Sequence, residues 1–510
     1  MFTGFILTDT KQLAPVIRSS QDKLKEILSD YASACASYIN WQLVDVADSM
    51  YDDIDKSDWR SFARMLNDYY IGLGLDGVQN CPLFIIGGDD IVPMPRIESP
   101  LAGRVGNEYL CADFAYCFEP TKRVRLHDFI STKPRFAVGR LPLTRDWDIE
   151  ALKAYLCDCV DSVQTGVSIR GAAMTTTQSW LRASREMMRD IPISPLDSDY
   201  VPLNNRMIVS PDLDTQYSDM YDGYIHELKK VDFLVCNLHG SDRKGVAYFV
   251  GEDTSHSKYT VAVQPSMMEQ TAPYIFNTVA CFGGRYIGYE LEDSMLLSAM
   301  AYGTMLYSGS CEIALGGPDR EGNSELMMKL FTIYQHKGMP AGLAFAKAKQ
   351  DYYRTCHRDD SDECAMFTIL EFNLFGCPLI SMQPKLRADY SPTLLGHDVV
   401  EKQSPTYNPK EAIPAMGSAY QANDIHAYVR GLVDNNLAII REKVEKEVYQ
   451  RLGLGVENLQ HIMRLSDNHI ETGYQFIYRK TPDGAFPHFD MYYLVDTDTQ
   501  GGITKIIHTK

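Results

Sequence analysis

The chain has 510 residues and a formal charge of −18, from 49 Lys and Arg against 67 Asp and Glu. Hydrophobic residues make up 45% of it and charged residues 23%, a composition that excludes an intrinsically disordered protein and predicts several folded domains at this length. The negative charge argues against nucleic acid or an anionic membrane as a partner, because both bind basic surfaces.

The N-terminal sequence MFTGFILTDTKQ has only a short apolar run and does not resemble a signal peptide. Twelve cysteines are scattered without a disulfide-like spacing, which is expected of reduced thiols and predicts a cytoplasmic protein. Cys236 and His239 form an isolated C-x-x-H whose side chains would point to opposite faces of a strand. We therefore expect neither a metal site nor a cofactor.

Strand and helix patterns alternate through the first three quarters of the chain. The predicted elements are, in order, a strand at 2–9, helical periodicity across 12–70, an apolar strand from 81, a β-rich stretch ending at 134–143, a helix at 146–164, a strand at 171–177, a helix at about 179–190, strands at 231–238 and 273–280, a helix at about 289–302, a strand at 303–310 and a helix at 324–353. This alternation predicts the α/β class, with a mostly parallel sheet covered by helices on both faces.

The chain is predicted to divide into two α/β subdomains, 1–164 and 165–385, followed by a Pro-rich linker at 386–418. Beyond it, residues 419–510 combine one long helical pattern with three strands and predict a small α+β domain with an antiparallel meander. Its expected role is regulation or target recruitment. The alternative is that it simply packs on the preceding domain.

Two apolar strands end on residues with catalytic chemistry. The stretch VDFLVCNLHGS ends on His239-Gly240, and PYIFNTVACFGGR ends on Cys281 and two glycines. Parallel strands present their carboxyl ends at one rim of a sheet, so the imidazole and the thiol could meet there. An imidazole raises the thiolate fraction and later protonates a leaving amine, while the N–H groups of Gly240 and Cys281 are suitable oxyanion donors.

Each residue taken alone has an ordinary explanation. An apolar-run cysteine is usually a buried core residue, and a His-Gly pair is usually a turn. The conjunction of both at strand ends favours a thiol nucleophile with its base.

The segments CNLHGSDRKGVAYF and NTVACFGG resemble the His-Gly-Ser and Ala-Cys-Gly segments of the gingipains, cysteine peptidases of the caspase-like superfamily. Further segments fall in the order expected of that family: PLFIIGGDDIVPMPRI, YLCADFAYCFEP, PRFAVGRLPL, GTMLYSGS and EFNLFGCPLISM. The resemblance covers about residues 1–385 and implies a caspase-like fold and a cysteine endopeptidase. It matches His239 to the general base, Cys281 to the nucleophile and Gly240 to an oxyanion-hole donor.

The resemblance also implies where a peptide or protein substrate binds. TMLYSGSCEIALGG resembles the strand that pairs with the substrate backbone, which places Ser308, Gly309 and Ser310 along the cleft by β-augmentation. Glu312 follows this strand and would select Arg or Lys beside the cleaved bond. Arg182 and Arg185 offer the opposite preference, for acidic side chains.

Some positions depart from the family pattern. Thr278 stands where an acidic residue often precedes the Val-Ala-Cys run, and Cys377 stands where the closing motif usually has Asp. Gingipains are secreted with a prodomain, to which no segment here is similar. The acidic group that often orients the histidine does not align, and Glu186 and Asp242 are the candidates. The competing interpretation is therefore an inactive caspase-like scaffold that acts as a binding or regulatory module.

Overall fold

The computed structural model describes residues 2–51, 53–118, 134–189, 191, 207–210, 217–241, 248–252, 259–317, 323–356, 363–383, 435–467, 470–480 and 491–509. The predicted linker at 386–418 and Asp242 lie outside these residues. Within the described part of the chain, no helix is both long and apolar enough to cross a bilayer.

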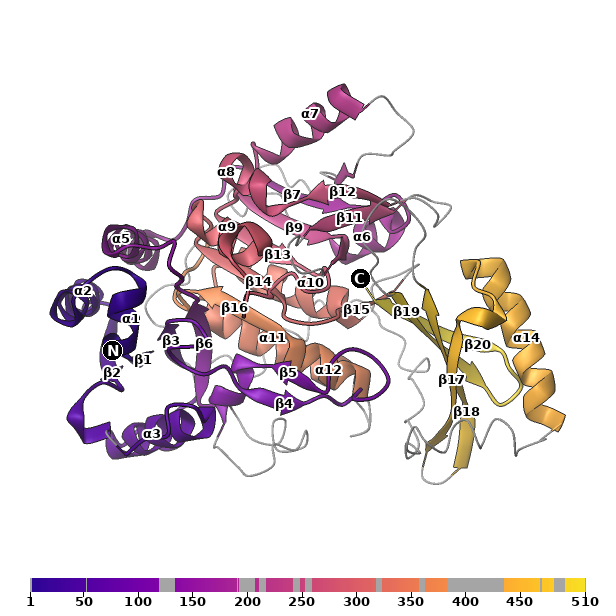
Figure 1. Ribbon diagram of the computed structural model, residues 1–510, viewed down its shortest axis with the longest axis horizontal. Helices are drawn as coiled ribbons and strands as arrows, with labels where there is room; N and C mark the ends of the chain where they lie inside the picture. The colour runs from indigo at the N-terminus through magenta and orange to yellow at the C-terminus, as the bar shows by residue number, and fades with distance from the viewer. Residues whose placement is uncertain are drawn as a thin grey trace.

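A ten-stranded sheet runs through the molecule (Figure 1). One half contains, in spatial order, β2 (Ile39–Asp45), β1 (Phe2–Thr8), β3 (Cys81–Ile86), β6 (Phe136–Leu141) and β16 (Phe372–Gly376). The other half continues with β14 (Leu306–Ser310), β13 (Ile275–Thr278), β9 (Phe233–Asn237), β7 (Ala172–Thr176) and β8 (Met207–Val209).

Neighbouring strands are parallel within each half of this sheet. The two halves meet where β16 pairs antiparallel with β14, so their strands run in opposite directions. The carboxyl ends of β14, β13, β9 and β7 consequently share one rim. This rim carries the candidate site.

The central strands are buried at every residue because their sequences, such as CPLFII and FLVCN, are nearly continuous apolar runs that need cover on both faces. Flanking helices provide this cover (Figure 1): α1 (Thr10–Val16), α2 (Gln21–Ala34), α3 (Trp59–Gly72), α5 (Ile149–Thr165), α6 (Leu181–Met187), α7 (Tyr217–Leu228), α8 (Met268–Thr271), α9 (Met295–Ala301), α10 (Asn323–His336), α11 (Ala341–Cys356) and α12 (Glu363–Glu371). The predicted α/β class with a mostly parallel sheet is confirmed, and the arrangement is consistent with a caspase-like fold.

Three details differ from the sequence-based expectation. The region 12–70 is not helical throughout, because β2 lies inside it and pairs with β1 as an edge strand of alternating burial. The helix expected at 324–353 is two helices, α10 and α11, separated at Gly338, whose φ of 74° is left-handed, and at Pro340. Finally, β16 belongs to the predicted second subdomain, 165–385, yet pairs with β6 of the first, 1–164. The large sheet is therefore continuous across the predicted boundary at residue 164.

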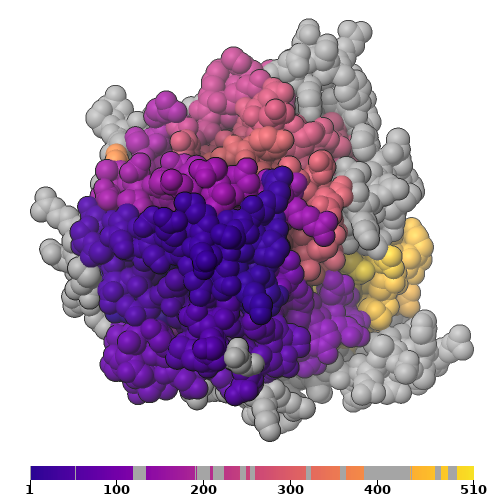
Figure 2. Space-filling model, turned by 60° about the vertical axis from the view of Figure 1, so that its left-hand side comes forward, coloured from indigo at the N-terminus to yellow at the C-terminus, as the bar shows by residue number. Residues whose placement is uncertain are grey.

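The described residues of the C-terminal domain form a helix and four antiparallel strands, one strand more than predicted: α14 (Asn435–Leu452), β17 (Leu459–Asp467), β18 (Ile470–Lys480), β19 (Met491–Asp498) and β20 (Ile503–Thr509). Its sheet is completed by β15 (Leu315–Gly316), which pairs with β20. The first part of the chain therefore supplies an edge strand to the C-terminal sheet. In Figure 2 the N-terminal residues form one broad face, and the C-terminal domain is visible at the side of it.

Candidate active site

His239 and Cys281 lie at the same rim of the sheet, as their positions after two apolar strands predict. β9 and β13 are parallel neighbours, and Thr278 at the end of β13 is level with Cys236 near the end of β9. Beyond β9, His239 and Gly240 form β10, which pairs antiparallel with β11 (Phe249–Glu252). Beyond β13, the chain turns at Cys281.

The backbones of Gly240 and Cys281 are in direct contact. A Cβ atom placed on Gly240 would lie 1.7 Å from the carbonyl oxygen of Cys281 and 2.9 Å from its nitrogen. Any side chain at position 240 would therefore overlap the backbone of the candidate nucleophile. Glycine is needed here for close approach, and this approach brings the His-Gly segment against the thiol residue.

The thiol lies inside a tight turn. Cys281 is 3% exposed, and its Sγ accepts a hydrogen bond from the backbone N–H of Ala314 at 3.2 Å. The next residue, Phe282, has a left-handed φ of 57°, which costs a non-glycine residue roughly 1–2 kcal/mol. The N–H groups of Phe282 and Gly284 donate to the carbonyls of Glu312 and Ser310 at 2.7 Å each. These bonds fasten the turn to the end of β14 and offset its strain.

The imidazole of His239 is fully buried and held by a carboxylate. Its Nε2 lies 3.3 Å from Oε2 of Glu252, and its ring packs edge-on against Trp180 at a centroid distance of 4.2 Å. Because a carboxylate only accepts hydrogen bonds, this contact assigns the Nε2 proton to His239. Nδ1 is then the nitrogen that can exchange a proton with a thiol.

Glu252 is the acidic residue that contacts His239, and the sequence-based candidates did not include it. It is 3% exposed and ends β11, the strand that pairs with the His239 strand. Ser179 donates to its Oε2 at 2.8 Å, and Tyr259, which begins β12 (Tyr259–Val263), donates to its Oε1 at 3.0 Å. The hydroxyl of Thr177 bonds both the N–H and the carbonyl of the Glu252 backbone. These hydrogen-bond donors offset the cost of removing the carboxylate charge from water.

Of the two candidates named from the sequence for this role, Asp242 lies outside the described residues, and Glu186 does not fill it. Glu186, on α6, forms a partly exposed ion pair with Arg189, which follows the helix. The usable signal was the apolar stretch YFVGE, because a strand following a His-Gly tip can return an acidic residue to the histidine.

Ser308, Gly309 and Ser310 are buried inside the large sheet and do not line an open cleft. β14 lies between β13 and β16, and its register pairs Ser308 with Asn277 on one side and with Leu374 on the other. Ser310 pairs with Phe372, and its carbonyl accepts from Gly284. The expected β-augmentation at these three residues is therefore wrong, because the two neighbouring strands and the turn after Cys281 already occupy both edges of this strand.

Glu312 lies close to the nucleophile turn, since its carbonyl accepts the N–H of Phe282. Its side chain is 5% exposed, and its Oε2 accepts from the side-chain amide of Asn107 at 2.8 Å. Arg182 and Arg185 are exposed on α6, which begins directly after Trp180. Of the three residues named for specificity, Glu312 contacts the turn that holds Cys281, and the two arginines are exposed on α6.

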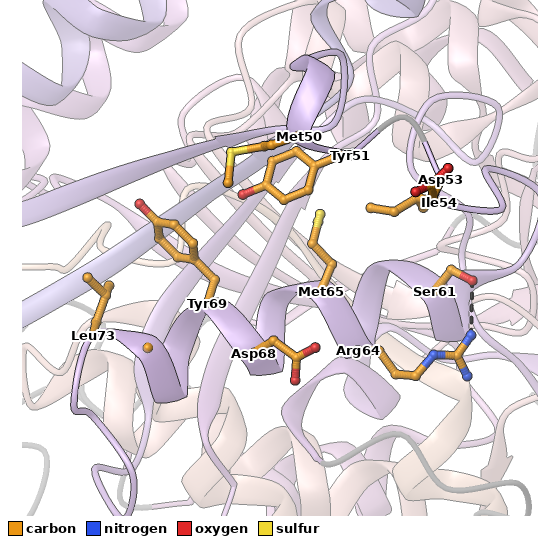
Figure 3. Close-up of a pocket in the computed structure, with 11 residues that line it drawn as sticks. Met50, Tyr51, Asp53, Ile54, Ser61, Arg64, Met65, Asp68, Tyr69 and Leu73 are labelled. Carbon is orange, nitrogen blue, oxygen red and sulfur yellow. Dashed lines mark hydrogen bonds between the residues drawn. The ribbon is translucent and has the colours of Figure 1, made fainter.

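A groove of about 700 Å³ lies elsewhere, between η1 (Ser49–Tyr51) and α3. Figure 3 shows Met65, Asp68 and Tyr69 of α3 facing it, and none of its lining residues belongs to the rim described above. It has no bearing on Cys281. Across the described ranges, no group of three or more His, Cys, Asp or Glu side chains is arranged to hold a metal ion.

Comparison with known proteins found no matching family model and no matching curated protein. Two solved structures are similar in backbone. A complex of the pro- and mature domains of RgpB from Porphyromonas gingivalis covers 75% of this chain and 80% of its own, with 10% identity and a TM-score of 0.46. A structure described as a protease covers 100% and 97%, with 9% identity and a TM-score of 0.45. Overlaps of this size support no argument about the chemistry of this chain.

Proposed function

We propose that the protein is a cysteine endopeptidase in which Cys281 is the nucleophile, His239 the general base and Glu252 the residue that orients His239. The observation that carries the proposal is the contact between the backbones of Gly240 and Cys281, beside an imidazole that is backed by a buried carboxylate. Glu252 does not touch the substrate in this scheme. It acts through the histidine.

The chemistry balances with these groups and water. Nδ1 of His239 takes the thiol proton, and the thiolate attacks the peptide carbonyl carbon to form a tetrahedral oxyanion. The C–N bond then breaks as the imidazolium gives its proton to the leaving amine, leaving a thioester on Cys281. Water, deprotonated by the same imidazole, attacks the thioester and releases the acid and the thiol. The carboxylate of Glu252 stabilises the imidazolium in both halves of the cycle.

The oxyanion is assigned to the backbone N–H groups of Gly240 and Cys281. The N–H groups of the three residues after Cys281 donate to the carbonyls of Glu312, Ala280 and Ser310, which removes them from consideration. The absence of a side chain at Gly240 allows its backbone to approach the reacting carbonyl.

For specificity, we extend the proposal to cleavage after a basic residue, with Glu312 as the selecting carboxylate. Its support is the hydrogen bond from Phe282 to its backbone and the burial of its side chain, where a carboxylate gains most from a cationic partner. The proposal also places the protein in a reducing compartment such as the cytoplasm, because the eleven cysteines whose side chains the structure describes are free thiols.

A peptidyl electrophile that labels active-site thiols tests the assignment. Labelling should disappear in Cys281→Ala and fall sharply in His239→Ala. Cys157→Ala is the matched control, because Cys157 is an exposed thiol on α5 and its loss should leave labelling unchanged. Labelling that persists in Cys281→Ala would overturn the proposal and favour an inactive scaffold.

A further inference from the structure

The last strand of the chain pairs with the segment that holds the thiol. β15 and β20 are antiparallel, with Leu315 opposite Thr509 and Gly316 opposite His508. β15 begins one residue after Ala314, whose N–H donates to the Sγ of Cys281. The final residues of the C-terminal domain therefore lie against the strand adjacent to the candidate nucleophile.

A peptidase needs a backbone edge beside its nucleophile on which to hold an extended substrate. β14 cannot provide it, because β13 and β16 flank that strand. In the C-terminal sheet, β15 is the terminal strand, and β20 is its neighbour. One edge of β15, the segment best placed to receive a substrate backbone, is thus already paired with the chain's own C-terminal strand.

We propose that β15 is the peptide-binding edge of the catalytic centre and that residues 508 and 509 of the same chain occupy it, so that the C-terminal domain inhibits the enzyme until it is displaced. This inference rests on the proposed peptidase function. It assigns the domain a regulatory role through direct obstruction of the site.

Side chains of the C-terminal strand also fill the space around the histidine. The ring of His508 stacks on Tyr493 at 5.6 Å and 21°, and it lies 5.1 Å from Trp180 and 6.4 Å from the ring of His239. His508 is 2% exposed, and Cys281 and His239 are buried as well. In this arrangement a polypeptide would pair with this edge of β15 only by displacing the C-terminal strand.

The C-terminal domain also contacts the hairpin that carries Glu252. Tyr248, Val250 and Tyr259 share one apolar cluster with Val444 and other C-terminal residues. The hydroxyl of Tyr259, which donates to Glu252, lies 3.7 Å from Sδ of Met491. Burial raises the pKa of Tyr493, and the negative charge of Glu252 adds to this rise. The inhibitory contact thus extends from the substrate edge to the carboxylate behind the histidine.

The experiment compares the full chain with a chain ending at Ile507, which lacks only the residues opposite β15 and their neighbour Lys510. His508→Ala is a second variant that keeps the chain length. Thr504→Ala is the matched control, since Thr504 is an exposed residue of β20 outside the β15 pairing. Circular dichroism and thermal melting establish that each variant is folded.

Two rates are measured: alkylation of Cys281 by iodoacetamide, located by peptide mass spectrometry, and hydrolysis of a fluorogenic peptide pool. Alkylation reports access to the thiol, and hydrolysis reports catalysis. We expect both rates to rise by about tenfold or more in the shortened chain. A tenfold rise corresponds to a loss of about 1.4 kcal/mol in the free energy that favours the covered state over the open one. The rise in His508→Ala should be smaller, and Thr504→Ala should match the full chain.

The outcomes separate this inference from the proposed function. Alkylation that rises while no variant hydrolyses peptide supports the covering strand and counts against the peptidase. Measurable hydrolysis that is equal in all folded variants overturns the covering strand and leaves the peptidase intact. Rates that depend on protein concentration in the full chain would show that a second copy donates the strand, which also overturns the inference.

A disulfide lock tests the same contact in the opposite direction. Leu315 and Thr509 are direct partners, and antiparallel partners lie roughly 4.5–5.5 Å apart at Cα, within the range that a disulfide spans. In Leu315→Cys/Thr509→Cys, oxidation should suppress hydrolysis and reduction should restore it to the level of the single variants. Full hydrolysis in the oxidised, cross-linked protein would refute the obstruction.

Discussion

Replacing Glu252 by Gln should remove most of the catalytic rate while leaving the fold in place. Gln has the same shape, and its amide oxygen can still accept from Ser179 and from Nε2 of His239. The amide NH₂ then faces Tyr259, whose hydroxyl can rotate to accept. We therefore expect the free energy of unfolding to change by about 1 kcal/mol or less. What the variant loses is the negative charge beside the imidazole.

The size of this effect follows from the geometry. At 3.3 Å and an effective dielectric constant of about 20, an imidazolium and a carboxylate attract by roughly 5 kcal/mol. The two hydroxyl donors share the carboxylate charge, so the net stabilisation of the imidazolium is smaller. We expect kcat to fall by about 10²–10³-fold, equivalent to about 3–4 kcal/mol, with KM nearly unchanged because Glu252 does not touch the substrate.

The assay is steady-state hydrolysis of a fluorogenic peptide with Arg before the cleaved bond, measured in the full chain and in the chain ending at Ile507. Glu252→Ala is the contrasting variant, since it leaves the buried hydroxyl of Tyr259, the half-buried hydroxyl of Ser179 and an imidazole without their acceptor, at about 1–3 kcal/mol for each buried group. It should lower the thermal midpoint, and Glu252→Gln should not. A folded Glu252→Gln protein with kcat within about threefold of the original would refute the orienting role.

Three further predictions follow from the packing and burial. Gly240→Ala should destabilise the protein by about 3 kcal/mol or more and abolish thiol labelling, because its Cβ would overlap the Cys281 carbonyl. Gly223→Ala is the control and should do neither, because a Cβ there meets nothing within 4 Å. Equal thermal midpoints for the two variants would contradict the contact. Burial lowers the pKa of Lys349 to about 7, so above pH 7 the unfolded chain binds a proton that the folded chain has lost. The free energy of unfolding, measured by denaturant titration, should therefore rise by up to about 2 kcal/mol from pH 7 to 8.5. This rise should be missing in Lys349→Met. In a positional peptide library, preference for Arg and Lys should disappear in Glu312→Gln, while a preference for Asp and Glu that Arg182→Ala abolishes would reverse the assignment.

The sequence by itself determined the α/β class and the position of His239 and Cys281 at one rim of the sheet. Both follow from local patterns: apolar runs long enough for a strand but too short for a helix, ending at glycines, in a parallel order that puts their carboxyl ends at one rim. The register of β9 and β13 only had to bring two strand ends level, which parallel neighbours do without further information.

Tertiary structure alone decided the rest of the site. Glu252 reaches His239 because a hairpin folds back on the rim; the stretch YFVGE indicates a strand after the His-Gly tip, but only the pairing of that strand with β10 decides that Glu252, and not Glu186, contacts the histidine. Ser308 to Ser310 are closed off because β16, from far along the chain, pairs on one edge of β14. The pairing of β15 with β20 joins residues almost two hundred positions apart through two isolated backbone partners. Hydrogen bonds of this kind use the peptide groups that every residue carries. No pattern of side chains therefore predicts that residues 508 and 509 pair with β15.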